Sequence, residues 1–502
     1  MDSPESAPQA EDEVSPANSE LAERAVLYAS SLPGRTKWAA QTVDGAEATA
    51  SSGKSSEARG VTEKLPTPDD ESALGVMLKF YDLSASEALQ VADLVEVVGV
   101  LGQGSLPNSD WASAGAAADD ANADSQEQAV HPAIHVVLHE KVSDVWASKN
   151  QAPQPTLRTA DAAISHLSQA VCGDRSAAEW LLLSLLASIH TRKAPFALGH
   201  LSLRLLLPPT AEVSSFEPVL SFVLPAMVPI DLSLTTLNDE KVRFSPRSDS
   251  SSSLGLHAGR LQLAKGTTVL VKENMAEGRL SSHGLENLKS LSNVIKHSTL
   301  HYDFPYSPQP YALPVDLGFV MLSGGKQGDA QGTVGTGGLI ETDVDVVVEP
   351  NQTVAPQQLG GPSSSSSSAS SDESSLPALR CYLTEARRLA RTLTVSSEVA
   401  EEIQQDFVTS RSNSGGPSPS AAAVAASSAS QEDLLRRMDI ARLLAAARLR
   451  SSLEFADYRK AREMDEQRLL ALEKRKENMR ANVGAAKQAS SASSSSAAAS
   501  TR

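Results

Sequence analysis

The sequence predicts an α/β protein whose central part alternates strands with helices. Between residues 156 and 350, short β-branched and apolar runs alternate with segments of helical period, which is typical of a sheet covered by helices on both faces. The clearest run is Thr267–Val271, entered by Lys265 and Gly266, and it indicates a strand buried on both faces of a parallel sheet. We therefore expect an α/β core, preceded by a β-rich module and followed by helices.

The composition excludes several classes of protein. Among 502 residues, 61 acidic side chains outnumber 44 Lys and Arg, and the net charge of −17 argues against a general binder of nucleic-acid backbone. The two cysteines, Cys172 and Cys381, are far apart and form no metal or redox motif, which fits a reducing compartment. No apolar stretch reaches the roughly 20 residues that cross a bilayer, so we expect a soluble protein without membrane contact.

Residues 1–70 are mostly polar and are expected to be disordered, except for a short helix within Leu21–Trp38. Residues 71–150 show alternating apolar positions typical of a small β-barrel, and an Ala-, Asp- and Ser-rich insertion at 102–129 is expected to be disordered. The strands are expected at Gly75–Asp82, Asp93–Leu101 and His131–Leu138. This pattern predicts an OB-like module.

The OB-like module lacks the usual marks of nucleic-acid binding. A fold of this kind that binds single strands offers several exposed aromatics interleaved with Lys or Arg. These strands offer Lys79, Phe80 and Tyr81 and little else. We therefore do not expect direct nucleic-acid binding.

Within the core, residues 156–350, the period of the apolar residues predicts alternating elements. Helices are expected at Thr156–Gln169, Ala177–His190, Phe216–Leu224 and Leu285–His297. Further strands are expected at Leu198–Leu207, ended by Pro208 and Pro209, at Met227–Leu234 and at Leu313–Leu322.

A Ser-rich linker at 351–377 separates the core from a helical region at 378–475. Helices are expected at Leu379–Leu393, Val395–Arg411 and Leu434–Leu470. A Ser-, Ala- and Pro-rich insertion at 412–430 and an Ala/Ser tail at 476–502 are expected to be disordered.

The residues after the clearest strand are unsuited to ATP hydrolysis. An ATPase of the P-loop class places carboxylates there to hold Mg²⁺ and to polarise water. This chain has Lys272 and Glu273. A lysine competes with the metal, and one carboxylate is a poor anchor for an ion that requires octahedral oxygen ligation.

The best candidate for a phosphate-binding glycine loop is Cys172–Trp180. Against the Gly-Asp-Pro-Gly-x-Ala-Lys-Ser loop of replicative MCM helicases, Gly173, Asp174 and Ala178 match. Glu179 then stands at the lysine position and Trp180 at that of the metal-binding hydroxyl, and a carboxylate repels a triphosphate. We therefore interpret Gly173, Asp174, Glu179, Trp180, Lys272 and Glu273 as a degenerate nucleotide site, and expect no cofactor, no metal and no catalytic residues.

With these motifs, the chain resembles the minichromosome maintenance (MCM) complex-binding protein family from about Leu74 to about Leu470. The resemblance is sharpest in Gly173-Asp174, Ala177–Glu179, Pro195–Leu201, Tyr302–Phe304 and Tyr306. It implies a degenerate AAA+-like, MCM-like core with the OB-like module before it and a helical lid after it. It also implies a non-enzymatic nuclear regulator that binds MCM helicase subunits, associates with chromatin through them, controls their assembly or release, and acts in sister chromatid cohesion.

Two alternative functions stay open at this point. An active AAA+-type ATPase with an unusual site would bind nucleotide, and that binding would depend on Glu273. A DNA-binding replication factor would bind single-stranded DNA with a marked dependence on salt.

The C-terminal helices are basic within an acidic chain, and their arginines are candidates for a partner surface. The candidates are Arg387, Arg388, Arg391, Arg442 and Arg448. A solvated helix face with pairs such as Glu385 and Arg388 is the plainer interpretation.

Other patterns that suggest binding sites fail on spacing. Ser323–Gln327 has the look of a phosphate loop, but Val320 stands where its first glycine is needed. The pair His135 and His139 has no third ligand at a matching spacing, nor has the pair His297 and His301. We therefore expect no phosphate loop and no metal site at these places.

Overall fold

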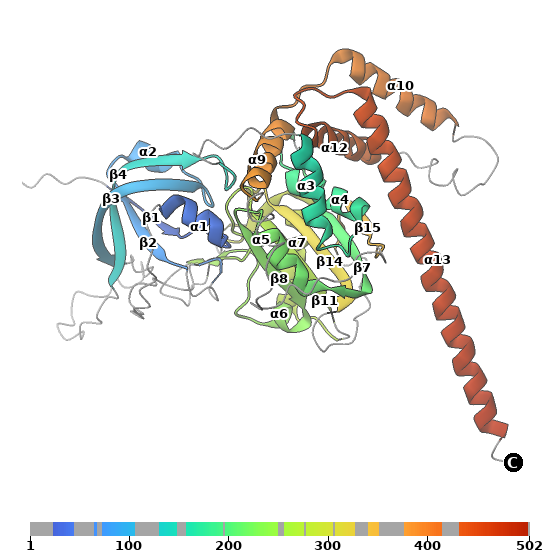
Figure 1. Cartoon of the computed structure of the whole chain (residues 1–502). Coiled ribbons are helices and arrows are strands. Elements are labelled where there is room, and N and C mark those ends of the chain that lie inside the picture. The colour runs from blue at the N-terminus through green and yellow to red at the C-terminus, as the bar shows by residue number, and fades with distance from the viewer. Residues whose placement is uncertain are drawn as a thin grey trace, which may run out of the picture.

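A computed structural model of the chain shows a small β lobe beside a larger α/β lobe, with a long helix projecting from the larger one (Figure 1). The structure describes residues 24–44, 65–67, 73–105, 130–147, 157–193, 196–248, 256–275, 278–304, 307–326, 340–350, 376–413 and 431–499. The disorder predicted for 1–23, 106–129, 351–375 and 414–430 lies outside these residues.

The small lobe is a four-stranded sheet in the order β1-β2-β4-β3. Its strands are β1 (Ala25–Ser30), β2 (Gly75–Phe80), β3 (Leu94–Ser105) and β4 (Val130–Val142), and a short helix, α2 (Leu83–Glu87), follows β2. β2 runs parallel to β4, and the other neighbours are antiparallel. The three predicted strands are confirmed, although β3 extends into the predicted insertion as far as Ser105, and β4 begins directly after that insertion, at Val130.

The helix predicted within Leu21–Trp38 is wrong. The chain forms β1 there, and the first helix, α1 (Lys37–Asp44), begins only after a turn at Gly34. Every residue of β1 pairs with β2, from Ala25 opposite Phe80 to Ser30 opposite Gly75. This long-range pairing overrides the weak local preference, so residues 1–70 are not as disordered as predicted.

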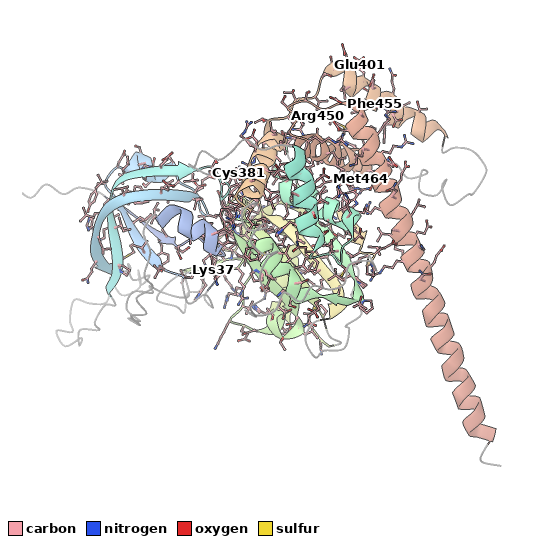
Figure 2. All side chains as sticks on the ribbon, in the orientation of Figure 1. Lys37, Cys381, Glu401, Arg450, Phe455 and Met464 are labelled. Carbon is pink, nitrogen blue, oxygen red and sulfur yellow. The ribbon has the colours of Figure 1, made fainter. Side chains whose placement is uncertain are left out.

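The two lobes are joined by buried hydrogen bonds. Thr36 Oγ1 donates to Leu224 O at 2.8 Å, and Trp146 Nε1 donates to Gly266 O at 3.0 Å. The guanidinium of Arg380 lies 4.2 Å from the ring centre of Trp38. The neighbouring residues Lys37 and Cys381 mark this junction in Figure 2.

The core of the large lobe is a five-stranded, wholly parallel sheet in the order β15-β7-β14-β11-β8. The strands are β7 (Leu203–Glu212), β8 (Met227–Ser233), β11 (Thr268–Asn274), β14 (Gly318–Lys326) and β15 (Val344–Val347). Numbered along the chain, their order is 5-1-4-3-2. The predicted α/β class is confirmed.

Helices cover both faces of this sheet (Figure 1). The helices of the core are α3 (Leu157–Ser168), α4 (Arg175–Leu186), α5 (Phe216–Ser221), α6 (Leu234–Asn238) and α7 (Ser282–His297). Side chains of β11 alternate between two apolar clusters: Leu270 packs with the α3 and α4 side, and Val269 and Val271 pack with the α7 side. A strand buried on both faces explains the uninterrupted apolar run in the sequence.

Smaller elements complete the core. They are β5 (Thr191–Lys193), β6 (Phe196–Leu198), the 3₁₀ turn η4 (Val213–Ser215), β9 (Arg247–Ser248), β10 (Leu256–His257), β12 (Thr299–Tyr302) and β13 (Tyr311–Pro314). The single strand predicted at Leu313–Leu322 is therefore two strands, and the helix predicted to His190 ends at Leu186.

Two prolines do not end β7, contrary to the prediction. Pro208 and Pro209 follow Leu207, where the pairing of β7 with β14 breaks before it resumes at Glu212 opposite Lys326. Proline removes a hydrogen-bond donor, and at this break in the ladder the donor is not required.

The described residues of the C-terminal region form the helices α9 (Leu376–Thr392), α10 (Ser397–Asn413), α12 (Gln431–Ala447) and α13 (Phe455–Ala499). The predicted helix Leu434–Leu470 is two helices, because the chain turns at Leu449, whose φ is +58°. The tail predicted to be disordered from residue 476 continues α13 to Ala499, where alanine favours a helix. The first half of α13 packs on the edge strand β15, which protects that edge.

Candidate functional site

The predicted glycine loop connects two helices and is not a phosphate loop. A phosphate loop follows a strand and opens a helix, whereas this loop joins α3 to α4. Gly173, with φ at +79°, donates its N–H to Ser168 O at 2.9 Å and so closes the end of α3. The side chain of Asp174 caps α4 by accepting from the N–H groups of Ser176 and Ala177 at 2.9 and 3.1 Å. The amide donors that a phosphate would need are already used.

Glu179 and Trp180 have structural roles in α4. Glu179 forms an ion pair with Lys460 of α13. Trp180 is buried in the apolar cluster between α4 and the sheet. The interpretation that these two residues replace a phosphate lysine and a metal-binding hydroxyl is therefore wrong, because the loop lies at a different point of the fold.

A phosphate loop lies between a strand and the helix that follows it, and the first such place in the core sheet is the segment between β7 and α5. That segment, the 3₁₀ turn Val213–Ser215, contains neither glycine nor lysine. It leads into α5, whose first turn carries Glu217. A carboxylate therefore stands in the first helical turn, where an ATPase of this class carries a cation.

Lys272 lies inside β11 and forms an ion pair with Glu217. An ATPase has a cation on the helix and a carboxylate on the strand, and here the two charges are exchanged. Both side chains are part-buried, and each neutralises the other. Sequence analysis found Lys272 but missed Glu217, because 55 residues separate the two and no local pattern links them.

Glu273 points to the opposite face of β11 from Lys272 and is held by Arg204 of β7. Its Oε1 lies 3.4 Å from Nη2 of Arg204, and both side chains are almost completely buried. Burial raises the pKa of Glu273, although the Arg204 charge opposes this shift. Arg204 also lies 3.6 Å from Asp345 on β15. Arg204 therefore links β7 to β11 and to β15, and Glu273 is turned away from solvent.

The structure does not bring Glu179 and Lys272 together as one site. Glu179 pairs with α13 and Lys272 pairs with α5, so each belongs to a different contact. Of the six predicted nucleotide-site residues, Lys272 and Glu273 lie toward the carboxyl end of a central strand, where open α/β sheets bind their ligands.

Four of the five predicted partner-binding arginines contact another part of the fold, whereas Arg388 pairs only within its own helix. Arg387 is 3% exposed and donates to Leu185 O at 2.8 Å and Ala187 O at 2.5 Å. Arg391 pairs with Asp144, Arg442 donates to Leu393 O at 3.1 Å, and Arg448 Nη1 lies 2.7 Å from Asp457 Oδ1. Only Arg388, which pairs with Glu385, lies mostly exposed among the five.

The arginines thus fasten helices together, and most of them do not form the predicted partner surface. The buried Arg387 in particular is out of reach of a partner. In the described part of the chain, no three His, Cys, Asp or Glu side chains gather as they would around a metal ion. No described helix has the length and apolar character to cross a bilayer.

A protein-family profile described as "Mini-chromosome maintenance replisome factor" matches residues 42–472. The chain belongs to this family. Relatives named "Mini-chromosome maintenance complex-binding protein" are found in animals and plants. The human protein is 26% identical over 78% of this chain and 60% of its own length, and the Arabidopsis thaliana protein is 25% identical over 80% and 64%.

The zebrafish (Danio rerio) relative is 28% identical over 61% of this chain and 44% of its own length. The chain therefore spans about half to two thirds of the length of these three family members. The match of the family profile covers β2, β3 and β4 of the small lobe, the core sheet and the first part of α13.

Proposed function

We propose that the chain is a non-enzymatic DNA replication factor that binds the MCM helicase complex. Membership of the family and the names of the relatives support MCM as the partner. We further propose that it acts in the nucleus, that it reaches chromatin through MCM, and that it controls assembly or release of the complex. A role in sister chromatid cohesion and mitosis is part of the same proposal.

The observation that carries the proposal is the exchanged charge pair of Lys272 and Glu217. A triphosphate entering there would meet a carboxylate on the helix, and Mg²⁺ would meet an ammonium on the strand. The second carboxylate, Glu273, is buried against Arg204 and offers no ligand to solvent. These residues favour a protein that binds partners over one that hydrolyses ATP.

The architecture supports a core of degenerate AAA+-like type. Its sheet is wholly parallel with helices on both faces, and α9, α10, α12 and α13 follow it along the chain as a helical lid would. We propose that the small lobe is the OB-like module. A body shaped like a helicase subunit could dock on an MCM neighbour without closing around nucleotide.

The surface that best fits a protein partner is on the small lobe. Among the described residues, the five most exposed large apolar side chains, at 63–76%, all lie on β3 and β4. They are Val98, Val100, Leu101, Val137 and Leu138. Val98 stands opposite Leu138 in the strand register, and β3 is an edge strand with one side unpaired in the sheet. Exposed apolar side chains that face each other on neighbouring strands, as Val98 and Leu138 do, favour a protein–protein contact.

Co-precipitation of purified MCM subunits with the chain tests this proposal. We expect one or more subunits to be retained, and the double change Val98→Ser with Leu138→Ser to reduce retention at least tenfold, since apolar contact area is lost. Val408→Ser on α10 is the matched control, because Val408 is 59% exposed but lies on another element. Retention that survives the double change would contradict the proposed surface, and no retained subunit would contradict the function.

A further inference from the structure

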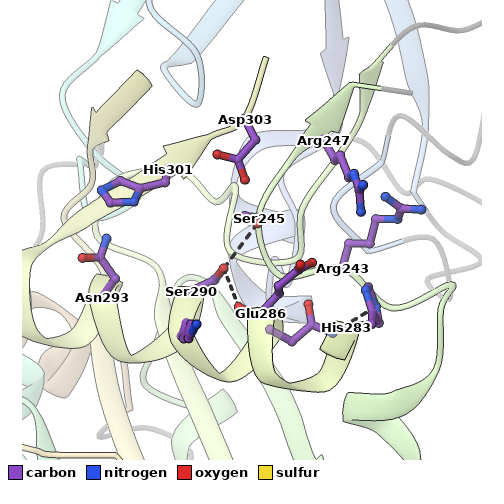
Figure 3. A pocket seen from close by; sticks show the side chains of 11 residues that line it. Arg243, Ser245, Arg247, His283, Glu286, Ser290, Asn293, His301 and Asp303 are labelled. Carbon is purple, nitrogen blue, oxygen red and sulfur yellow. Dashed lines mark hydrogen bonds between the residues drawn. The ribbon is translucent and has the colours of Figure 1, made fainter. Parts of the chain in front are cut away.

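A polar pocket of about 510 Å³ lies beside α7, away from the residues discussed so far. Figure 3 shows it between α7 and the chain that carries Arg243 and Arg247, with His301 and Asp303 at its far side. Its volume falls within the range of small-ligand and side-chain pockets, roughly 300–1,000 Å³. Every residue that lines it has a polar or charged side chain, which distinguishes it from a packing defect in an apolar core.

The wall of the pocket that carries the two arginines is fixed by buried hydrogen bonds. Asn287 of α7 is 3% exposed, and its Oδ1 accepts from Phe244 N at 3.0 Å. Its Nδ2 donates to Val242 O at 2.9 Å, and Arg260 N donates to Arg243 O at 2.7 Å. The backbone on both sides of Arg243 is therefore held on α7, which fixes the position from which the Arg243 side chain extends.

Three of the side chains that line this pocket are cations outside any ion pair among the described residues. Within the described residues, the side chains of Arg243, Arg247 and Lys289 form no ion pair or hydrogen bond, in contrast to Arg387, Arg391, Arg442 and Arg448. The chain as a whole carries a net charge of −17, so three unpaired cations around one pocket are unusual for it. Arginine side chains present a planar fork that matches the oxygens of carboxylates and phosphates.

The remaining side chains limit what kind of anion fits. Ser245, Ser290 and Asn293 offer hydroxyl and amide groups that suit a peptide backbone. Glu286 and Asp303 also line the pocket and would repel a run of phosphates, and no Phe, Tyr or Trp ring is among the described residues that line it. These features favour one isolated anionic group on a polypeptide over a nucleic-acid strand.

We propose that this pocket binds a carboxylate or phosphorylated side chain of a partner polypeptide, with Arg243, Arg247 and Lys289 around the anion. The inference goes beyond MCM binding and does not depend on it. Screening by salt weakens such contacts, so binding falls as ionic strength rises.

Fluorescence anisotropy with three short peptides tests the proposal. The peptides share an alanine and glycine frame and carry a central phosphoserine, glutamate or serine. We expect saturable binding of the phosphoserine or the glutamate peptide, at least tenfold tighter than that of the serine peptide. The difference between the first two peptides identifies which anion the pocket prefers.

The change Arg247→Gln should weaken binding at least tenfold, and Lys241→Gln is the control, because Lys241 is exposed nearby but does not line the pocket. Equal binding of the serine peptide, or full binding by the Arg247→Gln protein, would overturn the proposal. Inorganic phosphate that competes at the same concentration as the peptide would also overturn it, as would tighter binding of single-stranded DNA than of any peptide.

Discussion

At the scale of single residues, burial decides the role of each arginine in the C-terminal helices. Arg387 donates to the last carbonyls of α4, at Leu185 and Ala187, which have no partner within that helix. Burial lowers the pKa of Arg387 to about 10, so the side chain is still charged at neutral pH. Its neighbour Arg388 is exposed and pairs only with Glu385.

Arg387→Ala should lower the free energy of unfolding by about 2–4 kcal/mol, since two buried carbonyls lose a charged donor. Arg388→Ala is the control and should lower it by less than about 1 kcal/mol, because exposed ion pairs contribute little. Urea unfolding of the two variants beside the unchanged chain measures both values. Similar losses in the two variants would show that burial does not separate their roles.

At the scale of elements, one carboxylate joins the last two helices. Asp465 of α13 is fully buried and accepts from Arg437 Nε of α12 at 3.0 Å and from Arg468 Nη2 at 2.6 Å. Burial alone would raise the pKa of Asp465, but the charges of Arg468 and Arg436 outweigh it and hold this pKa below its usual 3.8. Asp465 therefore stabilises the fold in its ionised form.

Asp465→Asn should lower the free energy of unfolding by about 3–5 kcal/mol at pH 7, because buried arginines lose their counter-ion. A carboxylate whose pKa is lower in the folded than in the unfolded state stabilises the fold at a pH above its unfolded-state pKa. This stability is lost as the pH falls through the folded-state pKa. The difference in free energy of unfolding between the unchanged chain and the variant should therefore become smaller below about pH 4. Urea unfolding at pH 7, 4 and 3 measures it.

Glu466→Gln provides the control for this series, because Glu466 is adjacent in sequence but forms an exposed pair with Arg462. Its effect should be small at every pH. A gap for Asp465→Asn that stays constant down to pH 3 would show that the carboxylate does not act through its ionised form.

Elements with a strong local period could be predicted from sequence, and those defined by distant partners could not. β2, β8, α3 and α7 stand where their apolar spacing places them. The sequence predicts a helix in place of β1, because the partner strand that defines β1 lies about 50 residues further along the chain. The helical period also ran through the break between α12 and α13, where the turn at Leu449 leaves no proline or glycine as a signal.

The same limit applies to the candidate site. The sequence shows that Lys272 stands where an ATPase has a carboxylate after a buried strand. Its partner Glu217 could not be predicted in this way, and the glycine loop was assigned wrongly, because a short motif does not state whether a strand or a helix precedes it.

At the scale of the whole molecule, the chain combines a parallel core, a small sheet with exposed apolar side chains, and helices fastened by arginines (Figure 1). We propose that this body binds MCM subunits and that nucleotide has no part in the contact. The exchanged charges of Lys272 and Glu217 are the reason for the second half of the claim.

The most direct test is a titration of purified MCM subunits with the full chain, measured with and without millimolar Mg-ATP. The account predicts saturable binding with the same dissociation constant in both conditions, and no ATP bound by the chain alone. Binding that requires ATP, or ATP bound by the chain in the absence of MCM, would contradict it.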